Sequence, residues 1–328
     1  MKALIWFTAM VLTLAVHACG VADSSDLALM KDGHRYLPDV VKRLPAYAFD
    51  ARGNDWAWAQ SGDSRDSLTF ERDGRRRWQI KLPGDLSVES FRVGPNDDVY
   101  LMNCVESTGG IRFFRATRDG VVDITESIWG TEAIPCTTGT FAIDASGNFY
   151  VMGERGLLRS IGGQPTVVAK KDNIYEVIGR PQSRTESNVV GISADGSIVI
   201  GDARGFSRGY VRFYEVSAAG QPKGILFTLP TTSYRPGEIF AIERALVTPN
   251  GSILATGDVE INYKNSVQSR SGVISISGAQ EFTALTLDRA DYVLDDIGLA
   301  GDGHLLTVAH PVGVPGGPLL LRYDLSRP

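Results

Sequence analysis

The sequence predicts an all-β fold, a six-bladed β-propeller whose last blade is closed by an N-terminal strand. A hairpin pattern recurs six times along the chain: an apolar strand, a turn rich in Gly, Asn and Asp, and a second apolar strand. After each hairpin come a third strand-like segment and, in most units, a Gly-containing turn and a fourth. Four antiparallel strands in about fifty residues make up one propeller blade.

The hairpin turns define the period of this repeat. Gly, Asn and Asp adopt the positive φ angles that tight hairpin turns require, and apolar strands flank each turn. A single blade cannot bury both of its faces, so we expect six blades to pack around a common axis. The aligned turn positions, which lie 44, 50, 49, 55 and 52 residues apart, are Gly53, Asp97, Gly147, Gly196, Gly251 and Gly303.

The sixth unit is one strand short, and the N-terminal region offers the missing strand. The Lys-Asp-Gly segment at 31–33 copies the Arg-Asp-Gly turns at 72–74 and 118–120, which join third and fourth strands. We therefore expect residues 33–42 to form the outer strand of the last blade. Closure of this kind leaves neither end of the ring as an unpaired strand edge.

The repeat and its closure make the chain resemble six-bladed propellers of the NHL-repeat and SMP-30/gluconolactonase type, over residues 33–328. In the gluconolactonase-like family, a Glu, an Asn and an Asp from different blades hold a metal ion. The Glu-Gly-Pro segment that usually carries the family's Glu is absent here, so no metal ligand is transferred. The resemblance implies one candidate function, a metal-dependent hydrolase, lactonase or lyase with acids at the top of the channel.

The N-terminus has the pattern of a bacterial export signal. A lysine at the second residue precedes an apolar run too short for a comfortable membrane span, and we expect residues 1–18 to be a signal peptide. Residues 19–32 would then form a flexible tether. Cys19 resembles the acylated cysteine of a lipobox, which implies a periplasmic lipoprotein anchored in the outer membrane; the alternative is cleavage after Ala18 or Ala22 without a lipid.

The cysteine count agrees with export. Of three cysteines, Cys104 and Cys136 remain as an even pair once Cys19 is acylated or removed. In an oxidising compartment a disulfide between them is the expected outcome. The propeller topology places both on the same face of adjacent blades.

Composition limits the range of partners. With 43% hydrophobic and 22% charged residues the chain has ordinary globular content, and its formal net charge of −5 provides no basic surface for nucleic acid. We expect a monomer whose only membrane contact is the lipid anchor.

Candidate binding residues follow from the blade topology. The loops between second and third strands, and between blades, share one face, called the top face here. These loops are long and irregular, whereas the hairpin turns on the opposite face are short and uniform. Each second strand ends in a polar residue, and we expect ligand binding by this set: Gln60, Asn103, Glu154, Asp202, Asp258 and His310.

The carboxylates of this set, Glu154, Asp202 and Asp258, suit a hard divalent cation such as Ca²⁺. The alternative is that strand ends are polar only because they exit into water. Four further acids lie before or within first strands, and so beside the channel. They too could bind a cation or be polar only because they face water: Glu89, Glu243, Asp295 and Asp296.

Two functions from different classes are therefore predicted. The first is a non-enzymatic exported propeller that binds a protein, peptide or glycan through its top-face loops. The second is the metal-assisted hydrolase, lactonase or lyase. The sequence contains no P-loop or H-E-x-x-H motif that would point to another catalytic class.

Overall fold

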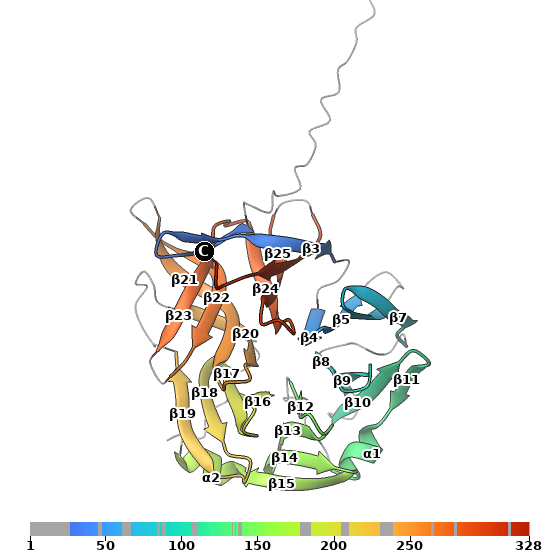
Figure 1. Ribbon diagram of the computed structural model, residues 1–328. Helices are drawn as coiled ribbons and strands as arrows, with labels where there is room; N and C mark the ends of the chain where they lie inside the picture. The colour runs from blue at the N-terminus through green and yellow to red at the C-terminus, as the bar shows by residue number, and fades with distance from the viewer. Residues whose placement is uncertain are drawn as a thin grey trace, which may run out of the picture.

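The computed structural model describes residues 27–44, 48–60, 67–83, 86, 90–105, 110–132, 134, 136, 140–177, 185–204, 210–229, 239–263, 266–278, 281–313 and 316–327. Within them, six antiparallel sheets stand around a central axis as the blades of a ring (Figure 1). The predicted six-bladed β-propeller is confirmed. The proposed signal peptide and Cys19 lie outside the described residues, and no helix among those described is long and apolar enough to cross a membrane.

The blades follow one another in chain order. Blade one is β4 (Ala48–Arg52), β5 (Asp55–Gln60), β6 (Ser67–Arg72) and β7 (Arg75–Lys81). Blade two is β8 (Ser90–Val93), β9 (Val99–Val105), β10 (Gly110–Thr117) and β11 (Gly120–Asp123). Blade three is β12 (Ala142–Ile143), β13 (Phe149–Gly153), β14 (Gly156–Ile161) and β15 (Gln164–Lys170). The short helices α1 (Thr125–Trp129) and α2 (Lys171–Val177) follow blades two and three.

The second half of the ring has the same order of strands. Blade four is β16 (Thr185–Ile192), β17 (Ile198–Arg204), β18 (Tyr210–Val216) and β19 (Pro222–Thr228). Blade five begins with β20 (Ile239–Val247), β21 (Ile253–Tyr263), β22 (Ser266–Ile276) and β23 (Phe282–Leu287). Blade six is β24 (Tyr292–Leu299), β25 (Leu305–Pro311), β26 (Leu319–Tyr323) and the N-terminal β3 (Pro38–Arg43).

Strand β3 closes the ring, as the sequence predicts. It pairs antiparallel with β26, with Tyr323 opposite Pro38 and Leu319 opposite Arg43. The hydroxyl of Tyr323 also donates a 2.6 Å hydrogen bond to the carbonyl of Leu27. The two ends of the chain are thereby joined within one blade.

The closing segment is shorter than the expected 33–42, because part of it belongs to blade five. β1 (Leu29–Lys31) and β2 (His34–Tyr36) form a hairpin, and β1 pairs with β23 at the outer edge of that blade. Leu27 and Leu29 are fully buried there against Leu287. The burial of these leucines explains why residues 27–31, assigned to the tether from sequence, form part of the propeller.

The core consists of side-chain layers between neighbouring blades. Between blades two and three, the ring of Phe113 lies 5.7 Å from that of Trp129 and 5.5 Å from that of Phe141, measured between centroids. All three side chains are fully buried. Each blade therefore depends on its neighbours for burial of both faces, as the repeat pattern implies.

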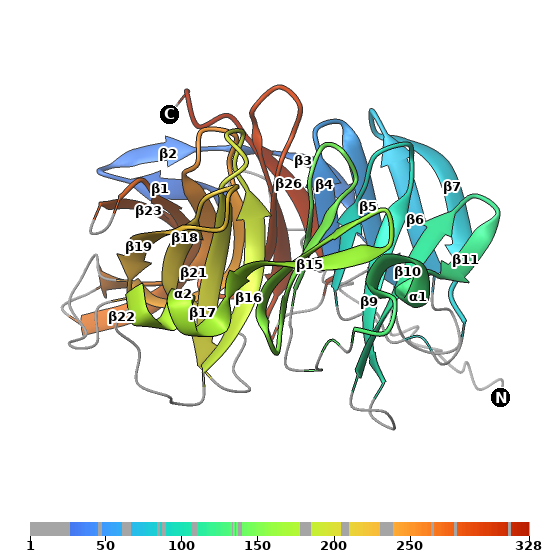
Figure 2. The same cartoon turned by 90° about the horizontal axis from the view of Figure 1, so that it is seen from below.

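The hairpin turns gather on one face of the ring, called the turn face here. In the side view of Figure 2 they lie along the upper edge. Adjacent turns touch: the N–H of Ala194 donates to the carbonyl of Pro249 at 3.3 Å, which joins the turns of blades four and five. Gly147 and Gly196 have φ angles of 83° and 80°, in the left-handed region that glycine adopts without strain. The fold thus uses the turn residues that hairpin geometry requires.

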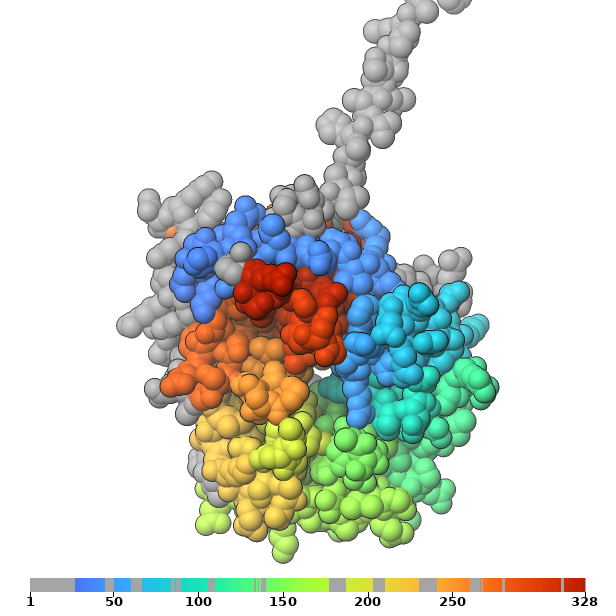
Figure 3. All heavy atoms as spheres, in the orientation of Figure 1, coloured from blue at the N-terminus to red at the C-terminus, as the bar shows by residue number. Residues whose placement is uncertain are grey.

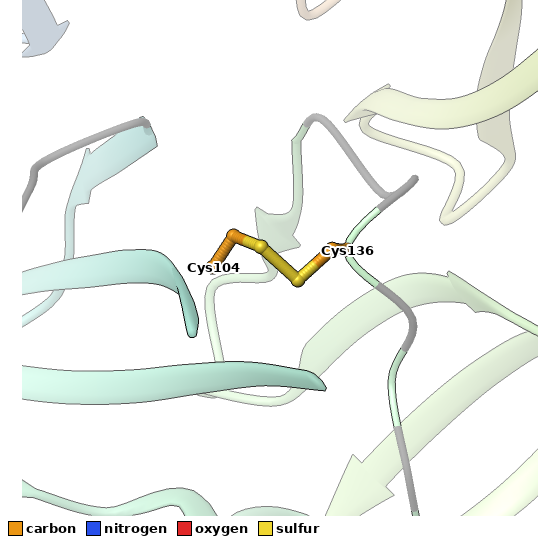
Figure 4. Close-up of a disulfide and its surroundings, with 2 residues drawn as sticks. All are labelled: Cys104 and Cys136. Carbon is orange, nitrogen blue, oxygen red and sulfur yellow. A yellow bond between two sulfur atoms is a disulfide. The ribbon is translucent and has the colours of Figure 1, made fainter. Parts of the chain in front are cut away.

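The predicted disulfide is confirmed. Cys104, near the end of β9, is bonded to Cys136 in the segment that leads to blade three, with 5.3 Å between their Cα atoms (Figure 4). Beside it, the N–H of Ile111 donates to the carbonyl of Ile134 at 2.8 Å. The bond ties the inter-blade segment to blade two.

Candidate binding site in the central channel

The first strands of the blades line a central channel that contains a cavity of about 110 Å³. Figure 3 looks onto the turn face and shows a narrow opening at the centre of the ring. The lining is polar and charged, although the core around it is apolar. Residues from all six blades contribute to it, among them Asp50, Arg92, Thr140, Tyr210, Arg244 and Asp296.

Asp50, in β4, is the carboxyl of blade one. Its Oδ2 accepts a 2.7 Å hydrogen bond from the N–H of Val93, and Arg92 Nη1 lies 3.7 Å from its Oδ1. Enclosure by the ring raises the pKa of Asp50 to about 6, although Arg92 and the Val93 N–H oppose the rise. The nearby carboxylate of Asp296 adds to the increase. Asp50 therefore titrates close to neutral pH.

A second charged pair lies across the channel, between blades five and six. Arg244 Nε is 3.4 Å from Asp296 Oδ1. Tyr210 of blade four, which is only 6% exposed, also lines the cavity. Burial raises the pKa of Tyr210, and the positive charges of Arg92 and Arg244 both oppose the rise. The phenol therefore lies within the field of both guanidinium groups.

A third acid, Asp295, accompanies His310 of the neighbouring strand. Asp295 Oδ2 lies 3.9 Å from His310 Nδ1. Burial raises the pKa of Asp295 to about 6, the His310 ring opposes the rise, and the charges of Asp296 and Glu243 add to it. Two carboxyls of this region, Asp50 in the cavity lining and Asp295 beside His310, thus have raised pKa values of about 6.

β-bulges bring these groups to the channel. The register between first and second strands shifts between Val189 and Gly191, between Ile242 and Arg244, and between Leu294 and Asp296. The extra residue in a bulge turns the neighbouring side chains to new directions. Arg244 and Asp296 directly follow such extra residues, and both line the cavity.

Of the candidate residues at second-strand ends, His310 lies beside Asp295 of a first strand. Asp202 is 2% exposed and accepts a 2.8 Å hydrogen bond from the hydroxyl of Ser187 within blade four. Asn103 is buried beside Cys104, and Glu154 is exposed in the turn between β13 and β14.

Asp258, of the same set, is partly buried, and this burial raises its pKa. The side chain of Gln60 and the whole of Glu89 lie outside the described residues.

Within the part of the chain that is described, no three or more His, Cys, Asp or Glu side chains are grouped to hold a metal ion. Glu154, Asp202 and Asp258 all belong to that part and do not form such a group. Asp202 and Asp258 lie on second strands and Glu154 follows one, each in a different blade, whereas first strands approach the axis.

The acids Glu243, Asp295 and Asp296 lie on first strands, as the sequence analysis assumes, but the arginines were missed. Arg92 and Arg244 sit in the apolar segments Ser-Phe-Arg-Val and Phe-Ala-Ile-Glu-Arg-Ala-Leu-Val. A charged residue inside an otherwise apolar first strand is the signal that would have identified both.

Comparison with known proteins shows the fold. A scan against protein-family models found no match, and a search of curated proteins found none either. Among solved structures, a gluconolactonase from Xanthomonas campestris is 11% identical, with a TM-score of 0.54 over 91% of this chain and 95% of that chain. A streptogramin B lyase is 10% identical, with a TM-score of 0.50 over 92% of this chain and 100% of that chain. The chain, a six-bladed propeller, thus has structural neighbours of these two types.

Proposed function

We propose that the chain is a ligand-binding β-propeller whose ligand enters the central channel from the top face. The charged lining of the cavity is the observation that carries this proposal. Charged groups enclosed by a protein ring lose hydration, so they destabilise the fold unless they are well paired. The propeller itself needs no charge at its axis. Arg92, Arg244, Asp50 and Asp296 are therefore best explained by a polar ligand that contacts them.

The proposed setting is the periplasm, with Cys19 as a lipid anchor. The Cys104–Cys136 bond agrees with this setting, because disulfides persist in oxidising compartments. In that setting we propose a peptide, a glycan or a protein segment as the partner. Top-face loops would hold its bulk, while the group that enters the channel would contact the arginines.

The test is a binding screen of the mature protein against small peptides, amino acids and acidic oligosaccharides. Ligand-observed NMR detects which compounds bind. Arg92→Gln and Arg244→Gln should each weaken a bound compound at least about tenfold, the loss expected for a charge-assisted hydrogen bond. Arg112→Gln is the matched control, because Arg112 Nη1 also lies 3.7 Å from a carboxylate, that of Asp123, but on the exposed outside of blade two. Equal binding by all four proteins would overturn the proposal.

A second candidate, an acid–base hydrolase or lyase, is favoured by one observation. Asp50 and Asp295 have pKa values of about 6, in the range that suits proton transfer near neutral pH. The described donors do not fit a metal site, so this candidate rests on the carboxyls alone. The test is a screen of lactone and uronate substrates: Asp295→Asn should abolish any turnover, and Asp302→Asn, on the turn face, should not.

A further inference from the structure

Each arginine of the channel cavity lies near one aspartate, Arg92 at 3.7 Å from Asp50 and Arg244 at 3.4 Å from Asp296, but the residues also group by charge. Arg92 from blade two and Arg244 from blade five both act on the phenol of Tyr210, and these three make the cationic side. Asp50 from β4 and Asp296 from β24 make the acidic side, because blades one and six are neighbours in the ring and these two strands are in contact. The negative charge of Asp296 contributes to the raised pKa of Asp50.

We propose that the cavity binds a small zwitterion, of which a free α-amino acid is the simplest example. The carboxylate of the ligand would lie between Arg92 and Arg244, and its ammonium group beside Asp50 and Asp296. This assignment rests on the proposed function of the channel and names its ligand class. A cavity of about 110 Å³ restricts the group bound there to a few heavy atoms beyond the two charges.

The cationic side is positioned to receive a carboxylate. Arg92 donates a 2.9 Å hydrogen bond to the carbonyl of Phe91, and its guanidinium lies 6.0 Å from the ring centroid of Phe141. These contacts hold its planar fork in place, and such a fork matches the two oxygens of a carboxylate. At 3.7 Å, the contact from Arg92 Nη1 to Asp50 Oδ1 is longer than a hydrogen bond, so the ligand need not break one there.

The charge balance distinguishes a zwitterion from a simple ion. A lone carboxylate would gain from the arginines but would be repelled by Asp50 and Asp296 on the other side. A lone amine would be attracted by Asp50 and Asp296 but repelled by the arginines. A ligand with both charges avoids this repulsion, because its carboxylate contacts the arginines and its ammonium group contacts the aspartates.

Proton release on binding provides an independent readout. The charged groups that act on Asp50 are Arg92, Asp296 and Arg52. Burial keeps the pKa of Asp50 near 6, and an ammonium group beside it would favour the ionised form. Near pH 6, binding of a zwitterion should therefore release a proton from this carboxyl.

The experiment is isothermal titration calorimetry of the mature protein with glycine, L-alanine and L-serine as zwitterions, acetate as the carboxylate and ethylamine as the amine. A zwitterion should bind at least about tenfold more tightly than acetate or ethylamine. At pH 6 its binding enthalpy should change with the ionisation enthalpy of the buffer, and this dependence should disappear in Asp50→Asn.

A variant that changes its preference between glycine and acetate distinguishes a change in the binding site from a loss of folding. The double variant Asp50→Asn/Asp296→Asn removes the acidic side, so it should bind acetate more tightly than the wild type does and lose its preference for glycine. Asp123→Asn, an exposed acid of blade two, is the matched control and should change neither. An unfolded protein would bind neither ligand, and circular dichroism would show this.

The failure of this inference can be separated from that of the proposed function. If other compounds bind and Arg92→Gln weakens them, but zwitterions bind no better than acetate, the zwitterion assignment is overturned and channel binding stands. If no compound in either panel responds to Arg92→Gln or Arg244→Gln, both are overturned.

Discussion

Arginine–aspartate pairs differ between the turn face and the channel. On the turn face, Arg72 donates hydrogen bonds of 2.5 and 2.8 Å to the two carboxylate oxygens of Asp55. Arg115 contacts Asp98 there at 2.8 and 2.9 Å. In the channel, the corresponding distances are 3.7 Å from Arg92 to Asp50 and 3.4 Å from Arg244 to Asp296. The same residue types thus join strands tightly at the turns and stand apart at the axis.

The environment decides what this difference means. A wide pair such as Arg112 and Asp123, at 3.7 Å, also occurs on the outside of the ring, where water screens both charges. The channel pairs are less exposed than Arg112 and Asp123, so hydration compensates them less. Tight pairs at the turns join strands, while the wide pairs in the channel are those that the proposed function assigns to a ligand.

The largest effect on stability should come from loss of the closing strand β3, because the turn face and the channel both depend on a closed ring. Deletion through residue 44 removes β1, β2 and β3, exposes the edges of blades five and six and uncovers Leu319 and Leu321. We expect loss of cooperative unfolding, measured by near-UV circular dichroism and denaturant titration. Deletion through residue 26 should leave the unfolding midpoint unchanged. A 44-residue deletion that unfolds cooperatively at the wild-type midpoint would show that the ring does not need this closure.

The disulfide should have the next largest effect. The double change Cys104→Ala/Cys136→Ala opens a loop with a sequence separation of 32 residues. Loop-closure entropy predicts a loss of about 3 kcal/mol in the free energy of unfolding. Urea titration of the variant, beside wild type with and without reductant, measures it. A loss below about 1 kcal/mol would show that the inter-blade segment is held by its other contacts.

The two regions should respond to pH in opposite directions. The folded-state pKa of Asp50, about 6, lies above the ordinary value of 3.8, so the ionised carboxyl destabilises the fold. This penalty is fully present above pH 6 and disappears as the pH falls from 6 toward 4. Asp50→Asn should therefore increase the free energy of unfolding at pH 7 by roughly 1–3 kcal/mol and flatten its rise between pH 7 and 5. An unchanged profile would contradict the raised pKa.

On the turn face, Asp195 provides the opposite case. The hydroxyl of Ser193, with further hydrogen bonds from Ser197, lowers the pKa of this carboxyl. Its contribution to stability is therefore present above pH 4 and lost as the pH falls below that value. Asp195→Asn should decrease stability at pH 7 and weaken the acid dependence below pH 4, again by urea titration. A gain in stability at pH 7 would contradict this assignment.

The smallest effect should separate the two kinds of arginine. Arg72→Gln should decrease the free energy of unfolding by about 1 kcal/mol, because it removes charge-assisted hydrogen bonds that are partly exposed to water. It should not change ligand affinity. Arg92→Gln should show the reverse, with affinity lost and little stability lost. If both variants alter the same property, the distinction drawn from their distances is wrong.

Local patterns in the sequence determined the number of blades, the closing strand and the disulfide. Turn residues such as Gly147 and Gly196 mark each hairpin because positive φ is a local requirement, and the two-residue alternation of strands is local as well. Cys104 and Cys136 were assigned to each other because they remain as an even pair once Cys19 is set aside, and the repeat positions them on adjacent blades.

Only the tertiary structure decided which residues meet at the axis. First strands of six blades bring side chains together from positions as distant as Asp50 and Asp296, and β-bulges at Val190, Glu243 and Asp295 set which of them face the cavity. Hairpin periodicity does not reveal a bulge or the relative height of two strands across a channel. Likewise, Leu27 and Leu29 are buried against Leu287 of blade five, more than 250 positions further along the chain. Hairpin periodicity does not reveal such a contact. Chemistry at the axis of a propeller is a long-range property, and a repeat read from sequence describes only the frame around it.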